Sequence, residues 1–93
     1  MVINIQSIRF KADDHLQAYV QEKVGKLFSV NDKILRADVK ISEQSGVNRY
    51  QCEIRLAVPG NHLIAKRSAE THKKAVYNAV STLSRRLRDQ KKR

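Results

Sequence analysis

The stretch KRSAETHKKAVYNAVSTLSRRLRDQKKR, residues 66–93, predicts the element around which the rest of the chain folds. Its apolar residues recur at helical spacing, which places four of them on one face of an α-helix: Val76, Val80, Leu83 and Leu87. The opposite face carries polar and basic residues: Lys74, Asn78, Ser81, Arg85, Arg88 and Lys92. Ten of the nineteen Lys and Arg residues lie in this stretch, against two acidic residues. One face of the helix therefore needs a core to cover, and the other favours a polyanion.

The length of 93 residues predicts one small domain, residues 1–93, with a basic tail from about residue 89. A formal net charge of +10 attracts nucleic acid or an anionic membrane surface. No apolar run approaches the roughly 20 residues of a membrane span, and the N-terminus does not resemble a signal peptide. Cys52 is the single cysteine, which excludes an internal disulfide. We therefore expect a soluble, cytoplasmic protein that is a monomer on its own.

The residues before this stretch predict a strand, a helix and three further strands. Ile3 and Ile5 alternate with polar residues as a first strand, with an irregularity near Ser7. A helix from about 13 to 28 follows, capped by Asp13 or Asp14, because its apolar residues recur at helical spacing. Alternation then predicts strands over 37–42, 50–58 and 62–67.

The final helix is expected to start at Ser68, with Glu70 in its first turn. The predicted fold is α+β with the order β-α-β-β-β-α. A four-stranded sheet with two helices packed on one face buries all the apolar stripes. This architecture is similar to that of double-stranded-RNA-binding domains.

The spacing of the histidine, cysteine and glycine residues predicts neither a catalytic site nor a metal site. His15, His62 and His72 each lack a Cys or His at ligand spacing, so no metal site is expected. Cys52 has the inward phase of a strand, which favours a small buried apolar residue over a nucleophile. The glycines are scattered and form no phosphate-binding loop. We expect no enzyme activity, no cofactor and no small-molecule substrate.

The basic face of the last helix has two interpretations, a solvated surface or a polyanion-binding surface. A solvated face normally mixes charges of both signs, whereas the like charges here repel by a few tenths of a kcal/mol per pair. Nucleic acid is favoured over membrane because the apolar face is needed for the core. Lys23 and Lys26 follow Tyr19 along one flank of the first helix, and Lys40 lies on a strand. These lysines could extend the basic surface.

Three stretches resemble the ribosome hibernation promoting factors and the related ribosome-associated inhibitor Y. INIQSIRFKADDHLQAYVQEKVGKL, residues 3–27, resembles the first strand and helix of that family. ILRADVKISEQSGVNRYQCEIRLAVPGNHLIAKRSAE, residues 34–70, follows its three-strand meander, and AVYNAVSTLSRRLRDQKKR, residues 75–93, resembles its closing helix and basic tail. The resemblance covers essentially the whole chain. Without the C-terminal extension of long members, the chain is similar to the short type.

The resemblance implies a ribosome-binding factor that acts in stationary phase or stress. Members bind the small ribosomal subunit and its ribosomal RNA in the channel for messenger and transfer RNA, which blocks translation and protects or pairs idle ribosomes. Matching positions imply RNA contacts by Lys23, Lys26 and Arg85. The basic residues of the last helix add further candidates: Lys73, Lys74, Arg86, Arg88, Lys91 and Lys92. The family usually begins its last helix with an acidic residue, Met and Tyr, whereas this chain has the more basic Lys73–Lys74 pair.

Two alternative functions remain open at this point. One is a regulatory protein that binds a transcription component and has incidental affinity for RNA. The other is a small RNA-processing enzyme, which the lack of a catalytic arrangement disfavours. No membrane partner is expected under any of these hypotheses.

Overall fold

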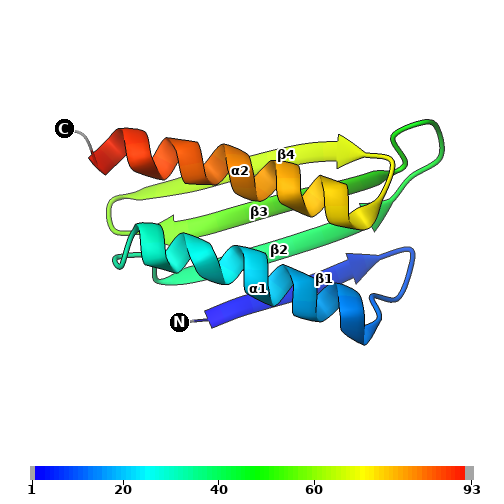
Figure 1. Ribbon diagram of the computed structural model, residues 1–93, viewed down its shortest axis with the longest axis horizontal. Coiled ribbons are helices and arrows are strands. Elements are labelled where there is room, and N and C mark those ends of the chain that lie inside the picture. Colours follow the sequence, from blue (N-terminus) through cyan, green and yellow to red (C-terminus); the bar gives the residue numbers. More distant parts are fainter. Residues whose placement is uncertain (1, 92–93) are drawn as a thin grey trace.

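The computed structural model describes residues 2–91, and its elements follow the predicted order (Figure 1). The elements are β1 (Val2–Ile8), α1 (Asp14–Val30), β2 (Arg36–Glu43), β3 (Tyr50–Val58), β4 (Asn61–Ala69) and α2 (His72–Lys91). The strands form one sheet in the order β1-β2-β3-β4, with β1 parallel to β2 and the other neighbours antiparallel. The predicted α+β fold is confirmed.

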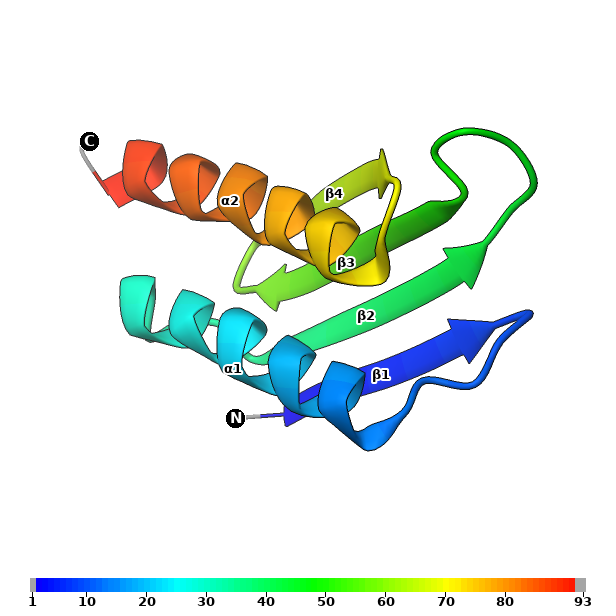
Figure 2. The same cartoon turned by 45° about the vertical axis from the view of Figure 1, so that its right-hand side comes forward.

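Both helices cover the same face of the sheet, side by side and running in the same direction (Figures 1 and 2). A parallel pair of strands needs a crossover connection, and α1 supplies it between β1 and β2. The chain leaves β4 at the end of the sheet where α1 also begins, so α2 runs parallel to α1. The C-terminal ends of both helices, where the helix dipole favours cations, therefore share one end of the molecule.

The core lies between the sheet and the two helices. β2 and β3 contribute alternate side chains that are almost fully buried, such as Val39, Ile41, Ile54 and Leu56. Leu16, Val20, Val24 and Leu27 of α1 are buried as predicted.

On α2, three members of the predicted stripe are fully buried, but Val80 is only partly buried. Ala75, Ala79 and Thr82 complete the buried face of this helix. Thr82 Oγ1 donates a hydrogen bond to the backbone oxygen of Asn78 at 3.0 Å, which satisfies its buried hydroxyl. Val80 lies instead at the margin that faces α1.

The start of α1 is confirmed and the predicted start of α2 is wrong. Asp13 caps α1, because its carboxylate accepts a hydrogen bond from the backbone N–H of Leu16 at 2.8 Å. Ser68 does not begin α2, because β4 continues pairing with β3 as far as Ala69. Thr71 is the cap, and its Oγ1 accepts a hydrogen bond from the Lys74 N–H at 3.1 Å.

The expected irregularity near Ser7 is also misplaced. β1 pairs with β2 in unbroken register from Val2 to Ile8, and the chain changes direction one residue later. Arg9 has a φ of 71°, the left-handed conformation. Phe10 can then pack against His72, with ring centroids 4.6 Å apart, and His72 lies 3.8 Å from the Tyr50 ring. These three rings tie the β1–α1 loop to the starts of β3 and α2.

Candidate nucleic-acid interface

A groove between α1 and α2 brings together basic residues that are far apart in the sequence. Lys23 and Lys26 line it from α1, and Arg85 and Arg88 line it from α2. Between these cations the groove has apolar and hydroxyl-bearing side chains: Leu27, Val30, Tyr77, Val80, Ser81 and Ser84. Its composition, four cations around a partly apolar floor, suits a ligand that has both phosphates and flat apolar surfaces.

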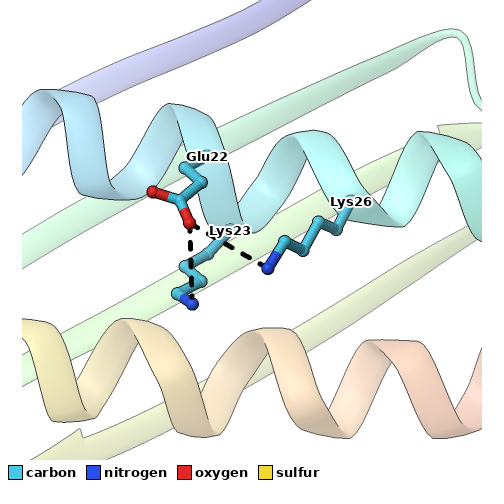
Figure 3. A network of polar contacts seen from close by, with 3 residues as sticks. All are labelled: Glu22, Lys23 and Lys26. Atoms are coloured by element: carbon cyan, nitrogen blue, oxygen red, sulfur yellow. Dashed lines mark ion pairs between the residues drawn. The ribbon is translucent and has the colours of Figure 1, made fainter.

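The two lysines of the groove share one weak acidic partner. The Nζ atoms of Lys23 and Lys26 each lie 3.9 Å from Oε1 of Glu22 (Figure 3). The side chains of Lys26 and Glu22 are 66% and 63% exposed, so solvent screens this contact. Exposed ion pairs of this kind contribute about 0–1 kcal/mol. Lys26 can therefore exchange Glu22 for a phosphate at little cost, whereas the Lys23 side chain is only 26% exposed.

Tyr19 links the basic residues of the two helices. The Lys23 Nζ lies 5.5 Å from the centroid of its ring, and the Lys73 Nζ lies 5.6 Å from the same centroid. Both distances fall within the range of cation–π attraction, which favours a cation over the face of an aromatic ring. Tyr19 therefore holds two ammonium groups, one from each helix, at the seam between α1 and α2.

The other predicted basic residues lie outside this groove. Lys74 is exposed near the start of α2, at the positive end of the helix dipole. Arg86 extends toward β4, where its guanidinium donates a hydrogen bond to the Ile64 backbone oxygen at 2.6 Å. Lys91 is the last residue of α2, while Lys92 lies outside the described residues.

The outer face of the sheet differs in charge from the helix face. Lys40 lies there and not beside the helices, next to Glu53 of β3, which in turn pairs with Lys66 of β4. Asp38 on the same face accepts a hydrogen bond from Asn4 at 2.9 Å and pairs with Arg36 at 3.2 Å. α2, by contrast, has six Lys and Arg residues against one acidic residue. Positive charge is thus concentrated on the helix side.

Within residues 2–91 there is no group of three or more side chains that could hold a metal ion. Burial raises the pKa of the Cys52 thiol to about 12, with a smaller contribution from the nearby Glu53 carboxylate. A thiol that is protonated and buried is a poor nucleophile. In the same part of the chain, no helix has the length and apolarity needed to cross a membrane.

Comparison with known protein families shows the family of this chain. The family described as sigma 54 modulation protein / S30EA ribosomal protein matches residues 3–93. The chain belongs to this family. Its members are ribosome-associated hibernation factors and translation inhibitors, which bind ribosomes and are not enzymes. The resemblance noted in the three sequence stretches is confirmed.

Two solved structures of similar proteins have the same fold as this family member. The N-terminal domain of Protein Y from Thermus thermophilus superposes with a TM-score of 0.82 at 23% identity, covering 97% of this chain and 99% of that one. A ribosomal subunit interface protein from Coxiella burnetii gives a TM-score of 0.87 at 15% identity, with both chains fully covered. A search of curated proteins found no match.

The sequence pattern did not identify Tyr77 of the groove, or Glu22, which lies beside the groove lysines. Glu22 gives no signal in the sequence because it is an acidic residue among basic candidates. Tyr77 lies outside the apolar stripe of α2 that predicts the core. Its spacing to Ser81, Ser84 and Arg88 is i, i+4, i+7 and i+11, which marks a second stripe along α2. That second stripe is the signal that could have revealed the groove.

Proposed function

We propose that this protein binds the small ribosomal subunit through the α1–α2 groove and inhibits translation without catalysing a reaction. It occupies the channel of messenger and transfer RNA in the cytoplasm of cells in stationary phase or stress. Away from the ribosome it is a monomer. The proposal extends the ribosome association of the family to a defined surface of this chain.

The observation that supports this proposal is the separation of charge between the two faces of the molecule. The helix face brings four cations into one groove, whereas the cations of the outer sheet face have acidic neighbours. A groove of one sign concentrates the positive potential and attracts a polyanion from a distance. Ribosomal RNA is the polyanion that a ribosome-associated family encounters.

The groove residues have the leading role in this proposal, and the other basic residues extend it. Lys23, Lys26, Arg85 and Arg88 neutralise phosphates that enter the groove. The flanking RNA is bound by the remaining candidates: Lys73, Lys74, Arg86, Lys91 and Lys92. Arg86 would first have to release the Ile64 carbonyl, so we assign it the smallest contribution among the described candidates.

Sedimentation of small ribosomal subunits with the protein at increasing salt tests the proposal. Each phosphate contact with single-stranded RNA contributes about −0.7 to the slope of log affinity against log salt, so the four groove residues account for about −3 of the slope and contacts to flanking RNA add to it. Replacing Lys26 and Arg88 with Met should reduce the slope by about 1.4. Replacing Lys40 and Lys66 with Met changes the net charge equally but on the outer sheet face, and should leave the slope nearly unchanged.

Equal effects of the two double substitutions would contradict the groove as the binding surface. Binding that does not weaken as salt increases would contradict the electrostatic mechanism. The alternative function is regulation of transcription, which the words sigma 54 modulation in the family description also suggest. Co-purification of the protein with its partners from starved cells distinguishes this function from ribosome binding. Ribosomal RNA and ribosomal proteins in the complex support ribosome binding. A polymerase or sigma factor in their place supports a transcription regulator.

A further inference from the structure

Tyr77 is an exposed aromatic side chain without a partner in the described part of the chain. It is 55% exposed, and it is the only aromatic among the well-exposed large apolar residues there. The other two tyrosines are engaged: Tyr19 lies under two lysines, and Tyr50 contacts Phe10 and His72 and donates a hydrogen bond to Glu43. Within residues 2–91, neither the ring nor the hydroxyl of Tyr77 makes such an interaction.

The position of Tyr77 places this free ring within the basic groove. It lines the groove together with Lys23 and Lys26 from α1 and with Arg85 and Arg88 from its own helix. At about 1.5 Å per residue along a helix, Arg85 and Arg88 follow it at about 12 and 16 Å. An RNA strand that lies along the groove can therefore place phosphates at the cations while a base reaches the ring.

We propose that Tyr77 is a stacking platform for an unpaired nucleobase of the RNA that enters the groove. This inference rests on the proposed function and specifies the kind of RNA that is bound. Bases inside an A-form helix are stacked on their neighbours and cannot reach an aromatic side chain, whereas bases in loops, bulges and single strands can. The groove therefore selects an unpaired segment over a continuous duplex.

Charge and stacking make separate contributions that can be measured separately. Phosphate contacts determine the salt dependence of binding, whereas stacking on an uncharged ring adds affinity that salt hardly changes. Loss of one stacked base corresponds to about a 5- to 150-fold loss of affinity. Removing the Tyr77 ring should thus reduce RNA affinity and leave the salt slope unchanged, whereas removing the Arg88 charge should reduce the slope.

The chain has no tryptophan, so Tyr77→Trp introduces a single fluorescent reporter at this position. We would titrate the full-length variant with a single-stranded adenine oligoribonucleotide and, separately, with inorganic polyphosphate, which has the charge but no bases. The RNA is expected to quench the emission by stacking, whereas polyphosphate should bind without comparable quenching. Tyr77→Ala should bind the RNA at least about fivefold more weakly and polyphosphate equally well, whereas Tyr77→Phe should retain RNA binding.

Three results would overturn the inference. They are an unchanged RNA affinity of Tyr77→Ala, quenching by polyphosphate equal to that by RNA, and quenching by whole small subunits but not by RNA. The last result would place a ribosomal protein against Tyr77. Wild-type binding to small subunits with the expected salt slope would preserve the proposed function in each case. Failure of the wild type to bind small subunits at all would contradict the proposed function itself.

Discussion

Arg86 and Arg88 lie two residues apart on α2, carry the same charge and have different surroundings. Arg88 lines the α1–α2 groove, whereas Arg86 donates a hydrogen bond to the backbone oxygen of Ile64. Replacing either with Met removes one positive charge, keeps a long unbranched side chain and hardly changes helix propensity. We expect Arg86→Met to affect mainly stability and Arg88→Met to affect mainly RNA binding.

The magnitudes follow from these contacts. The Arg86 hydrogen bond is exposed to solvent, so its loss should lower the free energy of unfolding by about 0.5–1 kcal/mol. For a domain of this size, that corresponds to a decrease in Tm of about 2–8 °C. A lost charged contact between Arg88 and a phosphate should lower the affinity for small subunits by about 1.5 kcal/mol, or roughly tenfold.

Thermal unfolding and salt-dependent sedimentation with small subunits together measure both effects. Arg88→Met should melt within about a degree of the wild type, and its salt slope should be smaller by about 0.7. Arg86→Met should melt earlier and have nearly the wild-type slope. Equal losses of affinity for the two variants would refute the separation of roles, because they would show that RNA binding depends only on the net charge.

Four further predictions concern the core packing of α2, the cap of α2, the Cys52 thiol and the ion pairs of Glu22. Leu83→Ala should lower the free energy of unfolding by about 2–5 kcal/mol in urea denaturation, because Leu83 is fully buried, whereas Val80→Ala at the groove margin should cost clearly less. Thr71→Ala removes the cap of α2 and should cost about 1 kcal/mol in the same assay, with helix content at low temperature unchanged. Because the Cys52 thiol has a pKa of about 12, roughly one native molecule in ten thousand is ionised at pH 8, and a thiol reagent should label it only when urea unfolds the chain. Glu22→Gln removes the only carboxylate within ion-pair distance of Lys23 and Lys26 among the described residues, so affinity for small subunits should rise, by up to about fivefold at low salt.

Elements defined by local periodicity were predictable from the sequence. Strict alternation along β3 and helical spacing in α1 each define one buried face, and the burial of those residues follows. The Asp13 cap depends on a hydrogen bond across three residues, so its signal is local as well. The start of α2 was not predictable in this way, because pairing of Ala69 with Tyr50, nineteen residues away, extends β4 past the apparent cap.

The candidate site was predictable in composition but not in arrangement. Basic residues on two helices are visible in the sequence, but only the parallel packing of α1 and α2 brings Lys26 into one groove with Arg85 and Arg88. Helical spacing separates Arg86 from Arg88 by about 200° around the helix axis. It does not show that Arg86 meets a carbonyl of β4, since that contact joins residues 22 positions apart.

The contact between Arg86 and Ile64 has a consequence for how the sheet meets other molecules. The Pro59–Gly60 turn closes on the pair Val58–Asn61, and bonded and non-bonded pairs alternate along an antiparallel ladder. The carbonyls of Ile64 and Lys66 therefore point away from β3, toward the open edge of the sheet.

Both of these carbonyls already accept hydrogen bonds from guanidinium groups. Arg86 bonds to Ile64, and Arg67 bonds to the Lys66 oxygen at 3.0 Å. Free backbone groups on an edge strand are a template for a strand of another chain, and such pairing leads to aggregation. An incoming strand would have to displace two charged side chains to pair with β4. Two of the cations that make this protein basic thus also discourage its copies from joining edge to edge.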